Sequence, residues 1–136
     1  RDTLRDADGR RWVASSFGLF EAVDDRLLPV AIADDDPGAR TPIVWCLATV
    51  GDELWAGTDD GMYRLDAARR VIARHRLGLG TDALPGAVVH AIHADDAGRL
   101  WVATSGGLVE ARRDNHGLRF EPQPALLAAR VRAVLS

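Results

Sequence analysis

Three residues of different chemistry occupy matching positions in three similar apolar runs. Trp45, His90 and Arg132 each follow the first valine of a run that reads V-W-C-L, V-H-A-I or V-R-A-V. An indole, an imidazole and a guanidinium that face one space could together bind a polar, planar ligand such as a sugar ring. The alternative interpretation is that all three are solvated strand residues.

A second set of polar residues lies in segments that read as turns. Asp59, Asp60 and Ser105 stand just before a glycine and an apolar run, as Ser16-Phe17 does earlier in the chain, and Arg40 lies in a long polar loop. Positions needed for packing should recur in kind, whereas these differ. We therefore expect Asp59, Asp60, Ser105 and Arg40 to join the first three residues on one ligand-binding face. The alternative is that the turns are ordinary hairpin tips.

The other reactive residue types form no recognisable catalytic or metal-binding motif. His90 and His93 are three apart, so on a strand they point to opposite faces unless a bulge intervenes. The acidic run 34–36 lacks the spacing and the glycine of a calcium loop. Cys46 is the only cysteine, which excludes an intrachain disulfide, and we expect it to be a small buried residue. We expect no catalytic residue, no metal and no cofactor.

The composition is that of one soluble globular domain. Of the 136 residues, 47% are hydrophobic and 27% are charged, which excludes a disordered tail. The net charge of −3 argues against a nucleic-acid partner, and no run is apolar enough to cross a membrane. Because the chain begins Arg-Asp-Thr, without an initiator methionine or an apolar signal sequence, we expect it to be a segment of a longer protein.

An internal repeat of about 45 residues organises the chain. Three tryptophans are separated by 43 and 46 residues, and three glycines keep the same two intervals. The residues are Trp12, Trp55 and Trp101, and Gly18, Gly61 and Gly107. Two landmarks with one shared spacing indicate a structural unit that recurs.

Each repeat reads as four short strands, because β-branched and aromatic runs alternate with turn residues. The strands expected are 11–15, 18–23 and 28–32, then 43–50, 53–58, 62–66 and 71–76, then 89–94, 99–104, 108–112, 118–121 and 129–135. Four antiparallel strands at this period are typical of a β-propeller blade. We expect an all-β propeller with blades at about 1–36, 43–76 and 88–121, offset by one strand. The first blade would lack most of its innermost strand, and 129–135 would begin another blade.

The segment Asp95–Leu108 reads D-x-x-G-R-L-W-V-A-T-x-x-G-L, and it resembles the two-component regulator propeller repeat. Val89 and Ile92 supply the V-x-x-I strand that precedes this core in the family. The middle and first repeats match it at fewer positions, and Arg11 replaces the usual leucine. The resemblance implies the periplasmic sensor domain of a bacterial membrane receptor, whose output is a histidine kinase, a diguanylate cyclase or a DNA-binding domain. Many such domains are thought to sense glycans.

Three blades are too few to close a ring, since propellers have four to eight. Either the chain belongs to a longer ring, or copies associate as a dimer or trimer in which residues 129–135 complete the first blade of the next copy. The resemblance favours a non-catalytic module that senses a small molecule or an oligosaccharide. The alternatives are a propeller lyase or hydrolase that acts on polysaccharide, with His90 and His93 as acid and base, and a protein-interaction scaffold.

Overall fold

The computed structural model describes residues 2–6, 9–30, 42–68, 70–76, 84, 86–94, 99–114 and 117–122. All regular structure in this part of the chain is β-strand, which confirms the predicted all-β class. No helix in the described ranges has the length and hydropathy needed to cross a membrane.

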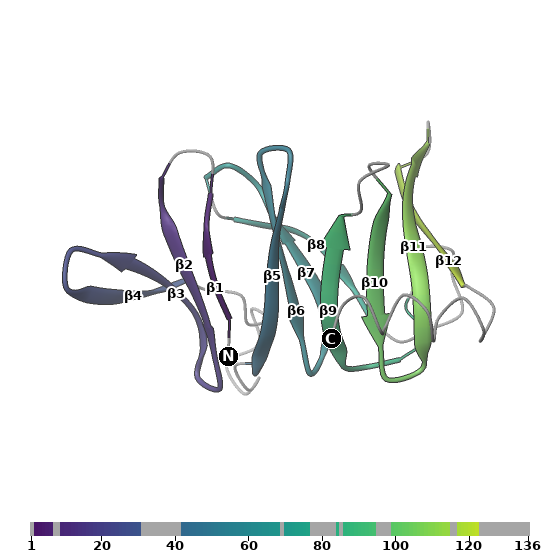
Figure 1. Ribbon diagram of the computed structural model, residues 1–136, viewed down its shortest axis with the longest axis horizontal. Coiled ribbons are helices and arrows are strands. Elements are labelled where there is room, and N and C mark those ends of the chain that lie inside the picture. Colours follow the sequence, from purple (N-terminus) through teal and green to yellow (C-terminus); the bar gives the residue numbers. More distant parts are fainter. Residues whose placement is uncertain are drawn as a thin grey trace.

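The described strands form three antiparallel four-stranded sheets, which stand side by side in Figure 1. The first sheet contains β1 (Asp2–Arg5), β2 (Arg11–Ser15), β3 (Gly18–Val23) and β4 (Arg26–Val30). The second contains β5 (Val44–Val50), β6 (Glu53–Thr58), β7 (Gly61–Leu65) and β8 (Val71–His75). The third contains β9 (Val89–Ala94), β10 (Leu100–Thr104), β11 (Gly107–Asp114) and β12 (Gly117–Pro122). Within each sheet the strand order follows the chain, as in a propeller blade.

The tryptophan of each of the first two sheets packs into the contact with the following sheet. Trp12 on β2 is fully buried in a cluster that includes Leu54 and Tyr63 of the second sheet. Trp55 on β6 is equally buried in a cluster that includes Val102 of the third sheet. A large flat side chain thus fills the space between neighbouring sheets. The repeated tryptophan is therefore a shared part of both described contacts between neighbouring sheets.

Strand β1 is absent from the sequence-based expectation, which left the first blade without most of its innermost strand. The segment D-T-L-R is short and has a single β-branched residue, so its pattern gives little strand signal. In the structure it pairs with β2, Leu4 opposite Trp12, and the Asp2 carboxylate accepts a hydrogen bond from the backbone N–H of Leu47 at 3.0 Å. The innermost position of the first sheet is therefore filled by the chain itself. The expected strand 129–135 lies outside the described residues.

A hydroxyl residue (serine or threonine) and a glycine close the hairpin between the second and third strands of each sheet. Thr58 Oγ1 donates to the carbonyl of Gly61 at 2.8 Å and accepts from the N–H of Asp60 at 2.9 Å. Thr104 makes the same two bonds in the third sheet, and Ser15 makes them in the first. Gly61 has a φ of 89°, a conformation that a β-carbon disfavours. The hairpins of the three sheets are thus built alike, and they differ in the side chains they display.

Candidate functional site

One end of the three sheets collects most of the residues expected to bind a ligand. Strands β1, β5 and β9 begin at this end, and the hairpins β2–β3, β6–β7 and β10–β11 turn there (lower edge of Figure 1). The strand register agrees, because Val44 at the start of β5 pairs with Thr58 beside the β6–β7 turn, and Val89 pairs with Thr104. We call this end the rim, defined by Phe17, Trp45, Asp59, Asp60, His90 and Ser105.

Trp45 and His90 occupy equivalent β-bulges at the rim. On β5, Val44 pairs with Thr58 and Cys46 with Gly57, so that Trp45 between them has no partner in the ladder. On β9, Val89 pairs with Thr104 and Ala91 with Ala103, so His90 likewise has no partner in the ladder. A bulge bends the strand and redirects the side chain of its extra residue, and such bulges are frequent beside binding sites. Strands β5 and β9 also contact each other, which places the two bulges on neighbouring innermost strands.

Asp59 and Ser105 have a structural role at the rim. The Asp59 carboxylate accepts from the N–H of Ile43 at 3.0 Å, and its own N–H donates to the Ile43 carbonyl at 3.1 Å. Ser105 contacts Val88 in the same manner, through its N–H at 2.9 Å and its Oγ at 3.3 Å. Each residue therefore ties its hairpin to the segment that leads into the innermost strand of its own sheet. A role in ligand binding stays a prediction for both.

Asp60 belongs to a polar group that is partly open to solvent. Its carboxylate lies 3.2 Å from the Arg76 guanidinium, and the two side chains are 49% and 41% exposed. The hydroxyl of Tyr63 donates to Asp60 at 3.4 Å and accepts from Arg76 at the same distance. The group places a hydrogen-bond acceptor, the carboxylate, and a donor, the guanidinium, at the rim.

Phe17 is a rim residue that sequence reasoning did not include among its ligand candidates. It occupies the tip of the β2–β3 hairpin, where Asp60 and Gly106 stand in the other two sheets, and it is 82% exposed. A large exposed aromatic ring on a tight turn has no packing explanation, whereas it provides a flat surface for stacking. The turn alignment contained the signal, because Ser16-Phe17 matches Asp59-Asp60. The predicted ligand residues Arg40 and Arg132 lie outside the described part of the chain.

Cys46 and the histidines provide no sign of catalysis in the described residues. Burial, followed by the charge of Asp2, raises the pKa of the Cys46 thiol to about 12, so it stays protonated and weakly nucleophilic at neutral pH. His90 sits in a bulge, which removes the simple opposite-face relation expected for His90 and His93. Within the described ranges, no three His, Cys, Asp or Glu side chains gather as a metal site.

Comparisons with known proteins agree with the repeat found in the sequence. Residues 83–106 match the family model of the two component regulator propeller. The structure is similar to the extracellular domain of a protein described as a hybrid two component system from B. thetaiotaomicron, with a TM-score of 0.64 and 17% sequence identity. The match covers 87% of this chain and 19% of the chain in the solved structure, so this chain spans about a fifth of the length of that protein chain. Among curated proteins, none matches. The chain thus has the fold of a β-propeller and carries a two component regulator propeller repeat at residues 83–106.

Proposed function

We propose that this chain is the ligand-sensing part of a bacterial signal-transduction receptor, and that it works outside the cytoplasm without catalysing a reaction. Two findings support a sensory role. The matched repeat belongs to two component regulators, and the similar solved structure is the extracellular domain of a two component system protein. Because a fold alone does not determine function, the support for a ligand site comes from the side chains of the rim.

The observation that carries the proposal is the pair of equivalent bulges at Trp45 and His90. Both interrupt the ladder at the same place, yet one displays an indole and the other an imidazole. The exposed ring of Phe17 lies at the same end of the sheets. Aromatic faces beside charged and polar groups suit the alternating apolar and hydroxyl faces of a sugar ring. We therefore propose that the rim binds an oligosaccharide.

A thermal-shift screen of neutral oligosaccharides, followed by calorimetric titration of any hit, tests this proposal. Trp45→Ala and Phe17→Ala should each weaken binding about fivefold or more, since an aromatic side chain stacked on a flat ligand group, as with nucleobases, is worth about 1–3 kcal/mol. Ile72→Ala is the matched control, because Ile72 is also an exposed hydrophobic residue, 49% accessible, on strand β8. Equal losses from Phe17→Ala and Ile72→Ala would argue against a rim site. Cleavage of the oligosaccharide that His90→Ala abolishes would favour an enzyme instead.

A further inference from the structure

The outward face of the first sheet carries two arginines side by side, at positions where the other sheets are uncharged. Arg5 on β1 and Arg11 on β2 are opposite each other in the strand register. Alignment on the tryptophans places Leu54 and Leu100 at the position of Arg11, and Thr49 and Ala94 at that of Arg5. Like charges directly opposite each other on a sheet destabilise it. The pair therefore needs an explanation other than packing.

Within the part of the chain that the structure describes, no carboxylate pairs with Arg5 or Arg11. Both arginines are exposed, and neither forms an ion pair or a side-chain hydrogen bond with any residue that the structure describes. Arg10 and Arg64 do have acidic partners, because Arg10 pairs with Glu21 at 2.8 Å and Arg64 pairs with Glu53 at 2.9 Å. Among the described residues, the guanidinium groups of Arg5 and Arg11 thus present positive charge and N–H donors without an acidic partner.

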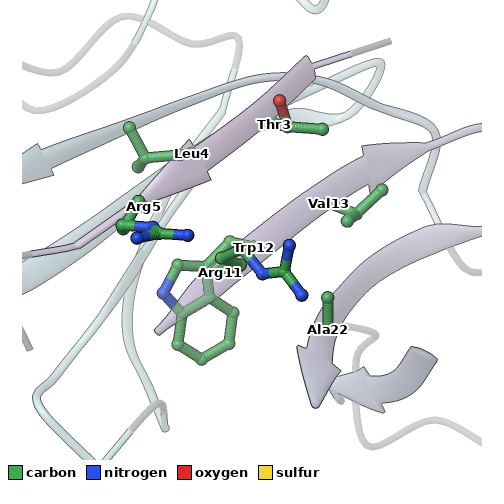
Figure 2. A pocket seen from close by; sticks show the side chains of 7 residues that line it. All are labelled: Thr3, Leu4, Arg5, Arg11, Trp12, Val13 and Ala22. Atoms are coloured by element: carbon green, nitrogen blue, oxygen red, sulfur yellow. The ribbon is translucent and has the colours of Figure 1, made fainter. Parts of the chain in front are cut away.

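The two arginines border a hollow of about 300 Å³. Figure 2 shows them as neighbours, and Thr3, Val13 and Ala22 line the same hollow. A volume of this size is at the lower end of small-molecule sites. Guanidinium groups bind carboxylate, sulfate and phosphate through paired N–H donors. The hollow therefore combines anion recognition with a small apolar wall.

From this geometry we infer that the first sheet contains a binding site for a small organic anion, with Arg5 and Arg11 as the groups that hold its charged oxygens. Thr3 provides a further hydrogen-bonding group, and Val13 and Ala22 contact the uncharged part of the ligand. In the second and third sheets the same face is apolar and is covered by the tryptophan of the preceding sheet. A purely apolar cover on the first sheet would bury two unpaired cations, which is unfavourable. An anion resolves that conflict, and the site is separate from the rim.

Calorimetric titrations with matched sugars test the inference. D-Glucuronate should bind and D-glucose should not, because they differ in the carboxylate; glucose 6-phosphate and glucose 6-sulfate then identify the preferred anion. Arg5→Gln and Arg11→Gln should each raise the Kd about tenfold or more, and the double variant should abolish binding. Arg70→Gln is the control, since Arg70 is an exposed arginine next to β8 in the second sheet. Binding should also weaken as salt is added.

Three results would overturn the inference. The first is the absence of binding for all three anionic sugars, and the second is an unchanged affinity in the double variant. The third is self-association of the wild-type chain, measured by light scattering, that the double variant loses while no anion binds; the face would then be a protein contact. Melting curves of the ligand-free variants control for folding, because removal of the like-charge pair should leave the Tm equal or higher. Trp45→Ala should leave glucuronate binding unchanged, which separates this site from the proposed rim site.

Discussion

Glu53 is expected to be the charged residue to which the second sheet is most sensitive, because one carboxylate accepts from a buried indole and from a largely buried guanidinium. Its Oε1 accepts from the indole N–H of Trp55 at 3.1 Å and from Nε of Arg64 at 2.9 Å, and its Oε2 accepts from Nη2 of Arg64 at 3.3 Å. The side chains of Arg64 and Glu53 are only 15% and 13% exposed. Replacement of Glu53 by alanine therefore leaves a cation and an indole N–H without this acceptor.

The expected loss follows from these contacts. Removal of one partner from a buried ion pair costs about 3–5 kcal/mol, and a buried donor left unsatisfied costs about 1–3 kcal/mol. Because Glu53 and Arg64 retain some contact with solvent, we expect the lower part of the combined range, about 4 kcal/mol, for Glu53→Ala. The Tm should fall by about 10–15 °C. Glu53→Gln retains an oxygen for the indole, so it should lose about half as much free energy.

The first sheet provides a matched control, because there the two tasks belong to different residues. Asp6 accepts from the indole N–H of Trp12 at 2.9 Å, while Glu21 pairs with Arg10, whose side chain is 37% exposed. Glu21→Ala should therefore cost only about 1 kcal/mol. Urea denaturation followed by tryptophan fluorescence measures all three variants. If Glu53→Ala and Glu21→Ala destabilised the chain equally, the reasoning from burial and shared acceptors would be refuted.

Two further predictions concern the tight contact between β5, β6 and β9. A β-carbon on Gly57 would lie 2.6 Å from Val89 Cγ1 and closer still to Cys46 Sγ. Gly57→Ala should therefore lower the free energy of unfolding, measured by urea denaturation, by about 1–3 kcal/mol. Adding Cys46→Ala to this variant should restore part of that free energy, and no restoration would contradict the packing argument. The second prediction follows from the pKa of Cys46, which burial raises to about 12 in the folded chain. The unfolded thiol ionises near pH 8.5, so the folded chain should lose stability between about pH 9 and 12, and Cys46→Ala should remove that part of the pH dependence. Rapid reaction of the folded thiol with a disulfide reagent at pH 8 would contradict the raised pKa.

The repeat, the blade architecture and the roles of the tryptophan and glycine landmarks could be predicted from the sequence. These residues recur because their geometry is local or is repeated at every sheet contact. Gly61 needs its positive φ to begin β7, and Trp55 fills the same inter-sheet space that Trp12 fills one blade earlier. A requirement repeated in each unit leaves a periodic trace in the sequence.

Features that depend on a single tertiary contact left no such trace. Strand β1 is four residues long and is stabilised by its pairing with β2 and by the bond from Leu47 to Asp2. The hydrogen bonds of the Asp59 and Ser105 side chains join residues 16 and 17 positions apart. A carboxylate and a hydroxyl could bind a ligand as well as they bind these backbone groups. Variation among the hairpin tips was therefore an ambiguous signal. It reflects the Asp59 carboxylate and the Ser105 hydroxyl, which accept hydrogen bonds from equivalent backbone segments of the second and third sheets.

The bulge positions resolve part of that ambiguity. In the described sheets, the paired residues of the innermost strands must match their ladder partners, and the hairpin residues must close the turn or hold the lead-in segment. Trp45 and His90 stand outside the ladder, so their side chains can differ without disturbing strand pairing. A repeat scaffold thereby separates positions that carry the fold from positions open to recognition. Exchange of the two residues, in the double variant Trp45→His with His90→Trp, should then leave the strand pairing intact while it alters ligand preference.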